Sequence, residues 1–255
     1  MIDREVTESF HLAFLTALGE VADREQYILK GGANLRFFHG SVRFSEDVDL
    51  DVPEVEAYRF TEKVERAFNG ALLKRLLALL GVEMVHLNPK DRTATKERWG
   101  VGLRHGTLDQ VATRVEISYR EYAYPPDASV VARVNEDVTK RHGAVLNPPL
   151  VRHYLPKAAV AQKVVALGDR RNTQPRDVFD LDLLFRRYPG AVAPGDIARS
   201  DLEVAIARTF EIGYDEFASR VVTFIEPDLA PIYAPMDAWG GMQSRVVECL
   251  ERLLP

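Results

Sequence analysis

Cysteine is nearly absent from this sequence, which has one, Cys249, among 255 residues. A single thiol cannot form an internal disulfide or a multi-cysteine metal site, so a cytoplasmic setting is expected. No apolar run approaches the roughly 18 residues that a membrane-spanning helix requires, and no membrane association is expected. The first residues, "MIDREVTESF", are polar and acidic, and they do not resemble a secretory signal.

The common nucleotide-binding and hydrolytic motifs are also missing. There is no G-x-x-x-x-G-K-[ST] loop and no G-x-G-x-x-G fingerprint, so P-loop and dinucleotide-binding folds have little support. The metalloprotease H-E-x-x-H and the hydrolase G-x-S-x-G are absent too. Composition is otherwise ordinary, with 46% hydrophobic and 28% charged residues, which excludes a globally disordered chain.

Charge is unevenly distributed. The net charge of −5 argues weakly against a protein that coats nucleic acid through its whole surface. Between residues 139 and 187, however, ten Lys or Arg stand against four Asp or Glu, a local excess of 10 − 4 = +6. Such a segment is typical either of a solvated helical face or of a groove for a polyanion, and the pattern alone leaves both open.

Hydrophobic periodicity divides the chain into an α/β part and a helical part. Apolar residues at helical spacing predict a helix over about residues 5–22, on which His11 is expected to be exposed. Further helices are predicted over about 54–80, 156–168, 175–187, 195–210, 213–224 and 238–253, and strands over 26–29, 47–52, 82–87, 99–105 and 110–120.

The segment "LNPPL", residues 146–150, is the most plausible domain boundary. We therefore expect an α+β domain over residues 1–148 and a helical domain over 149–255.

The strand "DVDLDV" carries three aspartates at alternate positions, Asp47, Asp49 and Asp51. Residues two apart on a strand point the same way, with Cα atoms about 6.5 Å apart, so two carboxylates can converge on one divalent cation. Glu116, amid apolar neighbours on a later strand, is the candidate third carboxylate. A solvent-exposed strand face explains the alternation equally well. Asp51 lies two residues before Pro53 and is expected at the exposed end of the strand.

A glycine pair, Gly31-Gly32, stands between the first predicted strand and a short helical stretch, "ANLRFFH". Glycines at a strand-to-helix junction let the backbone approach a phosphate, and the helix N-terminus supplies N–H donors and a positive dipole end. An isolated glycine pair more often marks a tight turn. The combination of a glycine pair with a following D-x-D strand is more specific, because it places a phosphate cradle beside a metal site.

These two stretches, "LKGGANLRFF" and "RFSEDVDLDV", resemble the polymerase-β-type nucleotidyltransferase superfamily. More narrowly, they resemble the AbiEii/AbiGii toxin branch, which includes the MenT toxins and whose members read approximately K-G-G-[TS]-x-L-R and R-x-S-x-D-h-D-h, h being apolar. The branch also carries A-x-K-[LV]-x-A-L and R-D-x-x-D helices, which appear here as "AQKVVAL" and "PRDVFDLDLL". Ala33 departs from the pattern, because many members have Thr or Ser there.

The resemblance implies a polymerase-β-like core with a mixed sheet, followed by a helical domain that completes the active-site cleft. It implies transfer of NMP from an NTP to RNA, with Mg²⁺ or Mn²⁺ as cofactor, tRNA 3′ ends as acceptor and a cognate antitoxin as partner. The implied nucleotide-binding residues are Gly31, Gly32, Ser45 and Lys163, the implied metal ligands Asp47, Asp49 and Glu116, and the implied catalytic residues Asp47, Asp49, Lys163 and Asp177.

Other interpretations remain open from the residues alone. Lys163 is equally typical of a surface lysine on a helix, and Asp177 and Asp180 of surface ion pairs. The acceptor could be a protein hydroxyl, which would make the enzyme protein-modifying or kinase-like. A non-catalytic regulatory binding module is the third possibility, although the intact Asp47 and Asp49 speak against it.

Overall fold

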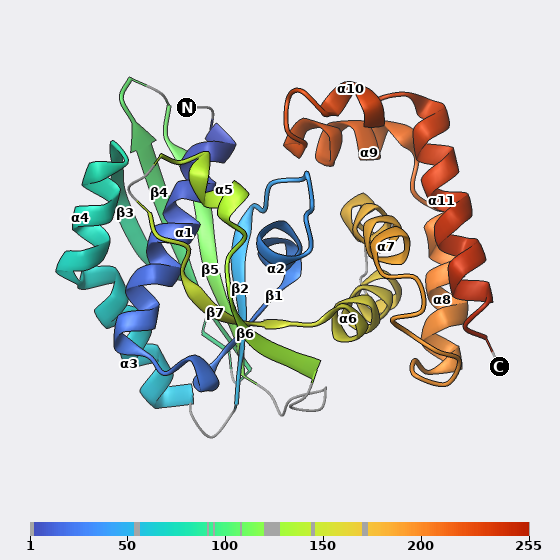
Figure 1. The fold of residues 1–255 in the computed structure, drawn as a ribbon, viewed down its shortest axis with the longest axis horizontal. Coiled ribbons are helices and arrows are strands. Elements are labelled where there is room, and N and C mark those ends of the chain that lie inside the picture. Colours follow the sequence, from blue (N-terminus) through green and yellow to red (C-terminus); the bar gives the residue numbers. More distant parts are fainter. Residues whose placement is uncertain are drawn as a thin grey trace. The chain divides into compact units, whose positions relative to one another are not determined.

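The computed structural model describes residues 3–53, 57–90, 92–93, 95–107, 109–119, 128–143, 146–169 and 173–254. The chain divides into two compact units, which Figure 1 shows as ribbons. The first unit comprises Met1–Gly40 and Phe44–Tyr154, and the second comprises Ser41–Arg43 and Leu155–Pro255. The division lies between Tyr154 and Leu155, a few residues after the predicted boundary at 148, because the last strand of the sheet follows the proline pair.

The first unit is built on one seven-stranded sheet with the order β3-β4-β5-β2-β1-β7-β6. Strand β2 runs parallel to β5 and β1 parallel to β7, whereas the other neighbours are antiparallel, so the predicted mixed sheet is confirmed. The strands are β1 (Ile28–Lys30), β2 (Asp47–Val52), β3 (Val82–Lys90), β4 (Lys96–His105), β5 (Val111–Tyr119), β6 (Ser129–Arg133) and β7 (Leu150–Tyr154).

Alternate residues of the central strands form the core face of the sheet. Val48, Leu50 and Val52 of β2 are fully buried, as the alternation predicts. They share one hydrophobic cluster with three helices, α1 (Asp3–Val21), α3 (Ala57–Asn69) and α4 (Ala71–Leu79) (Figure 1). The single helix predicted over 54–80 is wrong, because the chain breaks at Gly70, which is the N-cap of α4 with an extended ψ of 148°.

A buried polar network ties the first helix to the helix that follows β1. That helix is α2 (Gly31–Phe38), and its Arg36 donates from Nε to Oε2 of Glu8 at 2.5 Å. His142, just after α5 (Glu136–Lys140), bonds the other oxygen of Glu8 through Nε2 at 2.8 Å. Burial raises the pKa of Glu8, but the bonds from His142 and Arg36 outweigh it and hold that pKa below its usual value. The charged network therefore fixes α2 against α1.

The second unit is helical, as predicted. Helix α6 packs on α7 and α8, and α11 packs on α7 and α8. The predicted helix over 213–224 is split into α9 and a 3₁₀ turn, and α10 was not predicted. The helices are α6 (Pro156–Asp169), α7 (Pro175–Arg187), α8 (Arg199–Thr209), α9 (Tyr214–Arg220), α10 (Ala230–Tyr233) and α11 (Met236–Glu251).

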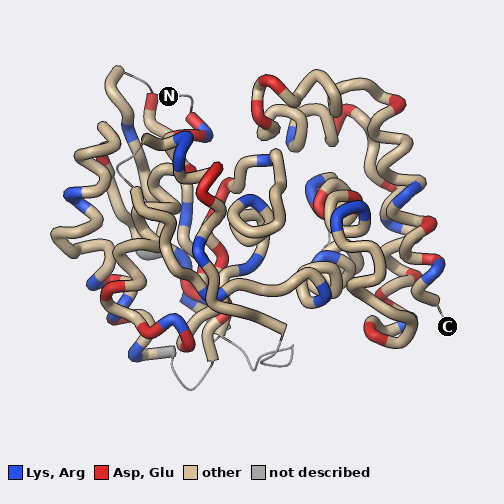
Figure 2. The backbone as a smooth tube through the Cα atoms, in the orientation of Figure 1, with Lys and Arg blue, Asp and Glu red and all other residues tan. Residues whose placement is uncertain are grey.

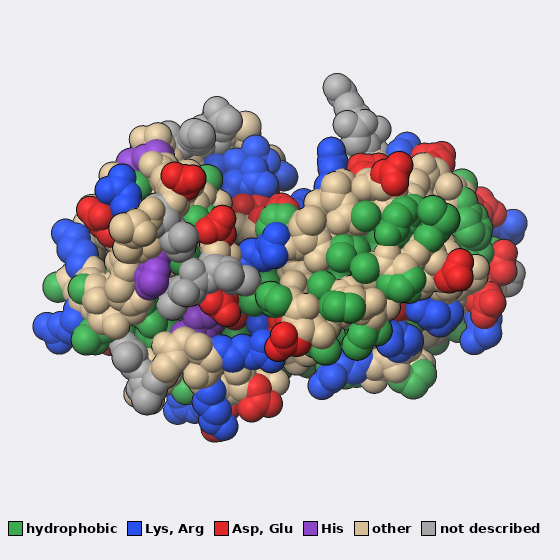
Figure 3. All heavy atoms as spheres, turned by 90° about the horizontal axis from the view of Figure 1, so that it is seen from above, with side chains coloured by type: hydrophobic (Ala, Val, Ile, Leu, Met, Phe, Trp, Pro, Cys, Tyr) green, Lys and Arg blue, Asp and Glu red, His purple; other side chains and the backbone are tan. Residues whose placement is uncertain are grey.

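Apolar side chains gather on one face of the second unit (Figure 3). The exposed large apolar residues of this unit include Phe210, Ile232 and Met236. None of the helices in the described part of the chain is long and apolar enough to span a membrane.

Candidate active site

The predicted D-x-D pair lies on β2, on the face of the sheet opposite the core. Asp47 is in register with Arg114 of β5, and Asp49 is in register with Glu116 of the same strand. Residues in register on parallel strands point to the same face of the sheet. The carboxylates of Asp47 and Asp49 therefore share this face with the side chains of Arg114 and Glu116. In Figure 2, the acidic residues of β2 stand beside basic residues of the neighbouring strands.

The glycine pair begins helix α2 and touches this face. Gly31 has φ +68°, in the left-handed region that favours glycine, and a Cβ atom there would lie 2.6 Å from Oδ2 of Asp49. Gly31 and Gly32 are the first two residues of the helix, where backbone N–H groups have no intrahelical acceptor. N–H groups that lack an intrahelical acceptor thus lie near a carboxylate, which is the arrangement expected for a nucleoside triphosphate beside a metal.

Asp47 is a strongly desolvated carboxylate. Burial raises its pKa to about 6, a hydrogen bond from Arg114 opposes this, and the charge of Asp49 raises it further. Nη2 of Arg114 donates to Oδ2 of Asp47 at 2.7 Å. A desolvated carboxylate beside a second negative charge gains from any cation that binds between them.

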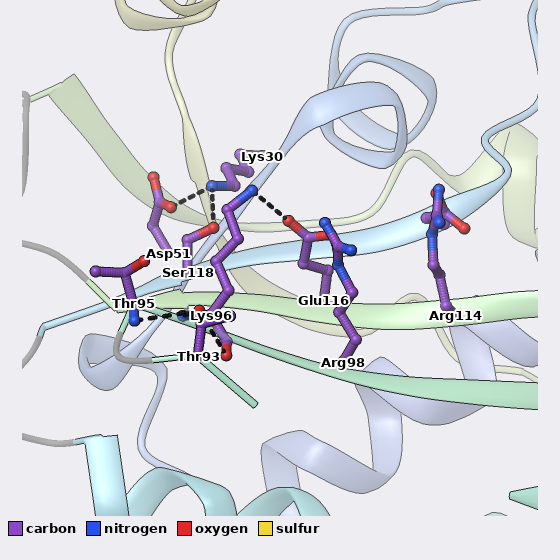
Figure 4. A network of polar contacts seen from close by, with 10 residues as sticks. Lys30, Asp51, Thr93, Thr95, Lys96, Arg98, Arg114, Glu116 and Ser118 are labelled. Carbon is purple, nitrogen blue, oxygen red and sulfur yellow. Dashed lines mark hydrogen bonds and ion pairs between the residues drawn. The ribbon is translucent and has the colours of Figure 1, made fainter. Parts of the chain in front are cut away.

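Glu116 is close to Asp49 in register, but basic side chains from β4 hold it. Arg98 Nε donates to Oε2 at 2.6 Å, and Lys96 Nζ donates to Oε1 at 3.1 Å (Figure 4). Burial raises the pKa of Glu116, yet these two bonds lower it below its usual value. Among the residues that the structure describes, no three or more His, Cys, Asp or Glu side chains are grouped to hold a metal. A role for Glu116 as third ligand stays a prediction.

The expectation that Asp51 is exposed is wrong. Its side chain is buried, with Lys30 bonded to Oδ1 and the hydroxyl of Tyr154 donating to Oδ2 at 3.0 Å. Lys30 also donates to Ser118 of β5 at 3.0 Å (Figure 4). Tyr154 lies at the end of β7, so the third aspartate joins β1, β2 and β7.

His11 is likewise buried rather than exposed. Its Nε2 lies 2.9 Å from Oγ1 of Thr113, and that hydroxyl donates to the carbonyl of Glu46 at 2.7 Å. Because the hydroxyl has one proton, Nε2 of His11 is the donor in the first bond. Ser45 is also buried, and its hydroxyl donates to the carbonyl of Asp47 at 2.8 Å. Both interactions fix the backbone at the start of β2.

The lysine and aspartate motifs on the two later helices form a buried ionic cluster in the second unit. Lys163 of α6 lies 3.0 Å from Oδ1 of Asp177 and 2.6 Å from Oδ2 of Asp180, both on α7. Arg43 approaches Asp180 to 3.1 Å. Burial would raise the pKa of Asp180, but the charges of Arg43 and Lys163 lower it below its usual value. The structure thus brings Lys163 and Asp177 together, with the amine buried rather than on the surface.

The cluster also changes the interpretation of the basic segment 139–187. Of its ten cations, Lys163 is buried, while Lys157 and Arg186 form ion pairs with Asp196 and Asp182. Arg170 and Arg171 lie outside the described residues. The segment is also divided between the two units at Tyr154, so it does not form one helical face.

The donor set of the first unit fits a divalent metal. Mg²⁺ prefers hard oxygen ligands and usually takes one or two carboxylates together with substrate phosphates. Asp47 and Asp49 would supply the carboxylates, and Gly31 leaves the space beside Asp49 that a side chain would fill. Ala33, the departure from the family pattern, is fully buried in the hydrophobic core, so packing accounts for its apolar side chain.

Several residues of this face were missed from the sequence. Lys96 and Arg98 precede the predicted start of their strand at residue 99, and no local pattern connects His11 with Thr113. The alternation of Arg114, Glu116 and Ser118 was visible, and a pairing of β5 with β2 would have placed Arg114 beside Asp47.

Known proteins share this architecture. Residues 13–250 match the family model described as nucleotidyl transferase AbiEii toxin, type IV toxin–antitoxin system. The solved structure of MenT4, a nucleotidyltransferase toxin from Mycobacterium tuberculosis, aligns with a TM-score of 0.61 and 19% identity, over 98% of this chain and 84% of that one. JHP933 from Helicobacter pylori aligns with a TM-score of 0.60 and 18% identity, over 99% and 95%.

No curated protein gives a significant sequence match. The structural likenesses show a shared nucleotidyltransferase fold, and the family match extends over nearly the whole chain. The chain belongs to the AbiEii family of nucleotidyltransferase toxins from type IV toxin–antitoxin systems.

Proposed function

We propose that this nucleotidyltransferase transfers NMP from an NTP to a 3′-terminal hydroxyl of RNA, with tRNA as the favoured acceptor and a cognate antitoxin as the protein that relieves its toxicity. The observation that carries this proposal is the close approach of Gly31 to Asp49, because it joins the N–H donors of α2 to the carboxylates of β2. The family membership supports the toxin role.

In the proposed reaction the acceptor oxygen forms a bond to the α-phosphorus of the NTP. The bond from that phosphorus to the α–β bridging oxygen breaks, its electron pair leaves with pyrophosphate, and the acceptor proton passes to water. Backbone N–H groups at Gly31 and Gly32 would hold the β- and γ-phosphates. Asp47 and Asp49 would hold Mg²⁺ or Mn²⁺, which when bound stabilises charge on the attacking and leaving oxygens.

Other residues of the first unit would keep this site in place. Ser45 and the pair His11–Thr113 fix the backbone around Asp47, and Arg114 balances the charge of Asp47. In the second unit, we propose that Lys163 and Asp177 contribute to the same reaction. The buried ion pair between them supports a shared role, either in phosphate binding or in holding α6 against α7.

The test compares two labels on the same NTP. The protein is incubated with total RNA or with cell protein and with NTP labelled at either the α- or the γ-phosphate. The proposal expects RNA to take up the α label and not the γ label. Transfer of the γ label would show a kinase-like reaction, and α label on protein alone would show a protein acceptor. Either result contradicts the proposal.

A further inference from the structure

The strand order places two different surfaces on either side of the D-x-D strand. On one side of β2 lies β1, which leads directly into Gly31 and the N-terminus of α2. On the other side lie β5 and then β4. In an in-line displacement the attacking oxygen and the leaving group stand on opposite sides of the phosphorus. If pyrophosphate leaves at Gly31, the acceptor hydroxyl must approach Asp47 and Asp49 from β5 and β4.

The side of β2 from which the acceptor would approach carries exposed basic side chains. The outer face of β4 and β5 carries three basic side chains, those of Lys96, Arg98 and Arg114 (Figure 4). The exposed fraction of the side chain is 44% for Lys96, 36% for Arg98 and 46% for Arg114. The carboxylates that they bind are much less accessible, with 12% exposed for Glu116 and 13% for Asp47. The acids therefore lie beneath, and a ligand arriving from solvent meets ammonium and guanidinium groups first.

These cations retain unused hydrogen-bond donors. Arg98 gives its Nε–H to Glu116, and Arg114 gives Nη2 to Asp47. Within the described part of the chain, both amino groups of Arg98 and the Nε and Nη1 of Arg114 have no acceptor. Guanidinium groups match phosphate oxygens in geometry and remain charged at all physiological pH values. Gly100 lies in register with Arg114 and adds no side chain to this face.

We propose that Lys96, Arg98 and Arg114 form a docking surface for the sugar–phosphate backbone of a single-stranded nucleic-acid 3′ end, which this face directs toward Asp47 and Asp49. The inference rests on the proposed nucleotidyl transfer and adds the surface that selects its acceptor. A serine or tyrosine of a protein acceptor brings no regular series of phosphates, so it would leave these cations without a ligand. The three cations thus favour a nucleic acid over a protein.

The test uses charge-removing variants that keep a hydrogen bond to Glu116. Lys96→Gln, Arg98→Gln and the double variant are compared with the parent for binding of a fluorescein-labelled single-stranded RNA at several KCl concentrations. Arg199→Gln is the matched control, because Arg199 is an exposed arginine that pairs with Glu203. Arg98→Lys keeps the charge. Thermal unfolding and NTP binding are measured on every variant.

We expect the double variant to bind RNA several-fold more weakly, and the slope of log Kd against log [KCl] to decrease by about 1.4, because each phosphate of a single strand that a cation neutralises contributes about 0.7. NTP binding and the Arg199→Gln control should be unchanged, and Arg98→Lys should keep the slope of the parent. In the transfer reaction, KM for RNA should rise while KM for NTP stays constant.

Two results would overturn the docking surface. One is an unchanged RNA affinity and salt slope in the double variant, and the other is an Arg98→Lys variant as weak as Arg98→Gln. The results that refute the docking surface can be told apart from those that refute the proposed nucleotidyl transfer. A parent protein that labels RNA while the Gln variants behave normally refutes only the surface, whereas a parent that transfers NMP to no acceptor refutes the reaction.

Discussion

A Cβ atom on Gly31 would lie 2.6 Å from Oδ2 of Asp49, so the carboxylate occupies the space that a side chain at the start of α2 would need. Gly31→Ala should displace the carboxylate and add backbone strain, because φ is +68°. The strain costs roughly 1–2 kcal/mol. We expect loss of the rise in melting temperature that NTP and Mg²⁺ give to the parent, measured by thermal unfolding with and without ligand.

Gly106→Ala is the matched control for this change. Gly106 also has a positive φ, +59°, and lies in the same unit, but among the described residues other than its chain neighbours no atom lies within 4 Å of an added Cβ. It should lose a similar amount of stability and keep the response to NTP. Equal responses of both variants to NTP would contradict a phosphate site at Gly31.

Asp47→Asn should make the protein more stable at neutral pH. The pKa of Asp47 is raised from 3.8 to about 6, so between these values the folded protein binds more protons than the unfolded chain. Stability from this group therefore increases as pH falls from about 7 toward 4, by up to about 3 kcal/mol. Asparagine removes that dependence. Urea denaturation at pH 7 should show a more stable variant, and a less stable one would contradict the account.

His11 has the opposite effect to Asp47, because it lowers the free energy of unfolding as pH falls, and His11→Gln should remove this loss. Burial lowers the pKa of His11 to about 3, so the unfolded chain takes up a proton below about pH 6.5 while the folded protein does not. This decrease in stability reaches about 2 kcal/mol at pH 5. Glutamine can still donate to Thr113 but does not titrate. The difference in unfolding free energy between variant and parent should favour the variant increasingly as pH falls from 6.5 to 5, and a constant difference would be the contrary result.

Variants of the buried ionic cluster in the second unit distinguish a structural role of Lys163 from a catalytic one. Lys163→Met leaves Asp177 and Asp180 short of a cation and should cost about 3–5 kcal/mol. Adding Asp177→Asn removes one of these charges, and Asp180 keeps Arg43. The double variant should therefore recover most of the stability in urea denaturation. If Lys163 or Asp177 acts in catalysis, transfer activity will stay absent, and a double variant with parental activity would exclude that role for both.

Local pattern and family resemblance predicted the elements that carry the candidate site. The strand Asp47–Val52 and the helix Pro175–Arg187 have the predicted bounds, because strict alternation and a proline at the first helical turn are local signals. The outer strands β6 and β7 lack such signals. The break at Gly70 was missed because the apolar periodicity continues across it.

Side-chain partners were less predictable than elements, because they depend on pairing between distant segments. Asp51 was assigned to an exposed strand end, yet Tyr154, at the end of a strand on the other side of β1, covers it. His11 meets Thr113 only once α1 packs on β5. The same holds for Glu116, whose partners Lys96 and Arg98 come from a neighbouring strand.

The most direct test of the account is transfer of α-labelled NTP to RNA by the parent and by Asp49→Asn. Asp49 is the carboxylate next to Gly31, and asparagine keeps its size while removing the charge that a metal requires. The account predicts label on the RNA only with the parent protein and only when Mg²⁺ or Mn²⁺ is present, with both proteins folded at the assay temperature. An Asp49→Asn variant that labels RNA at the rate of the parent would contradict it.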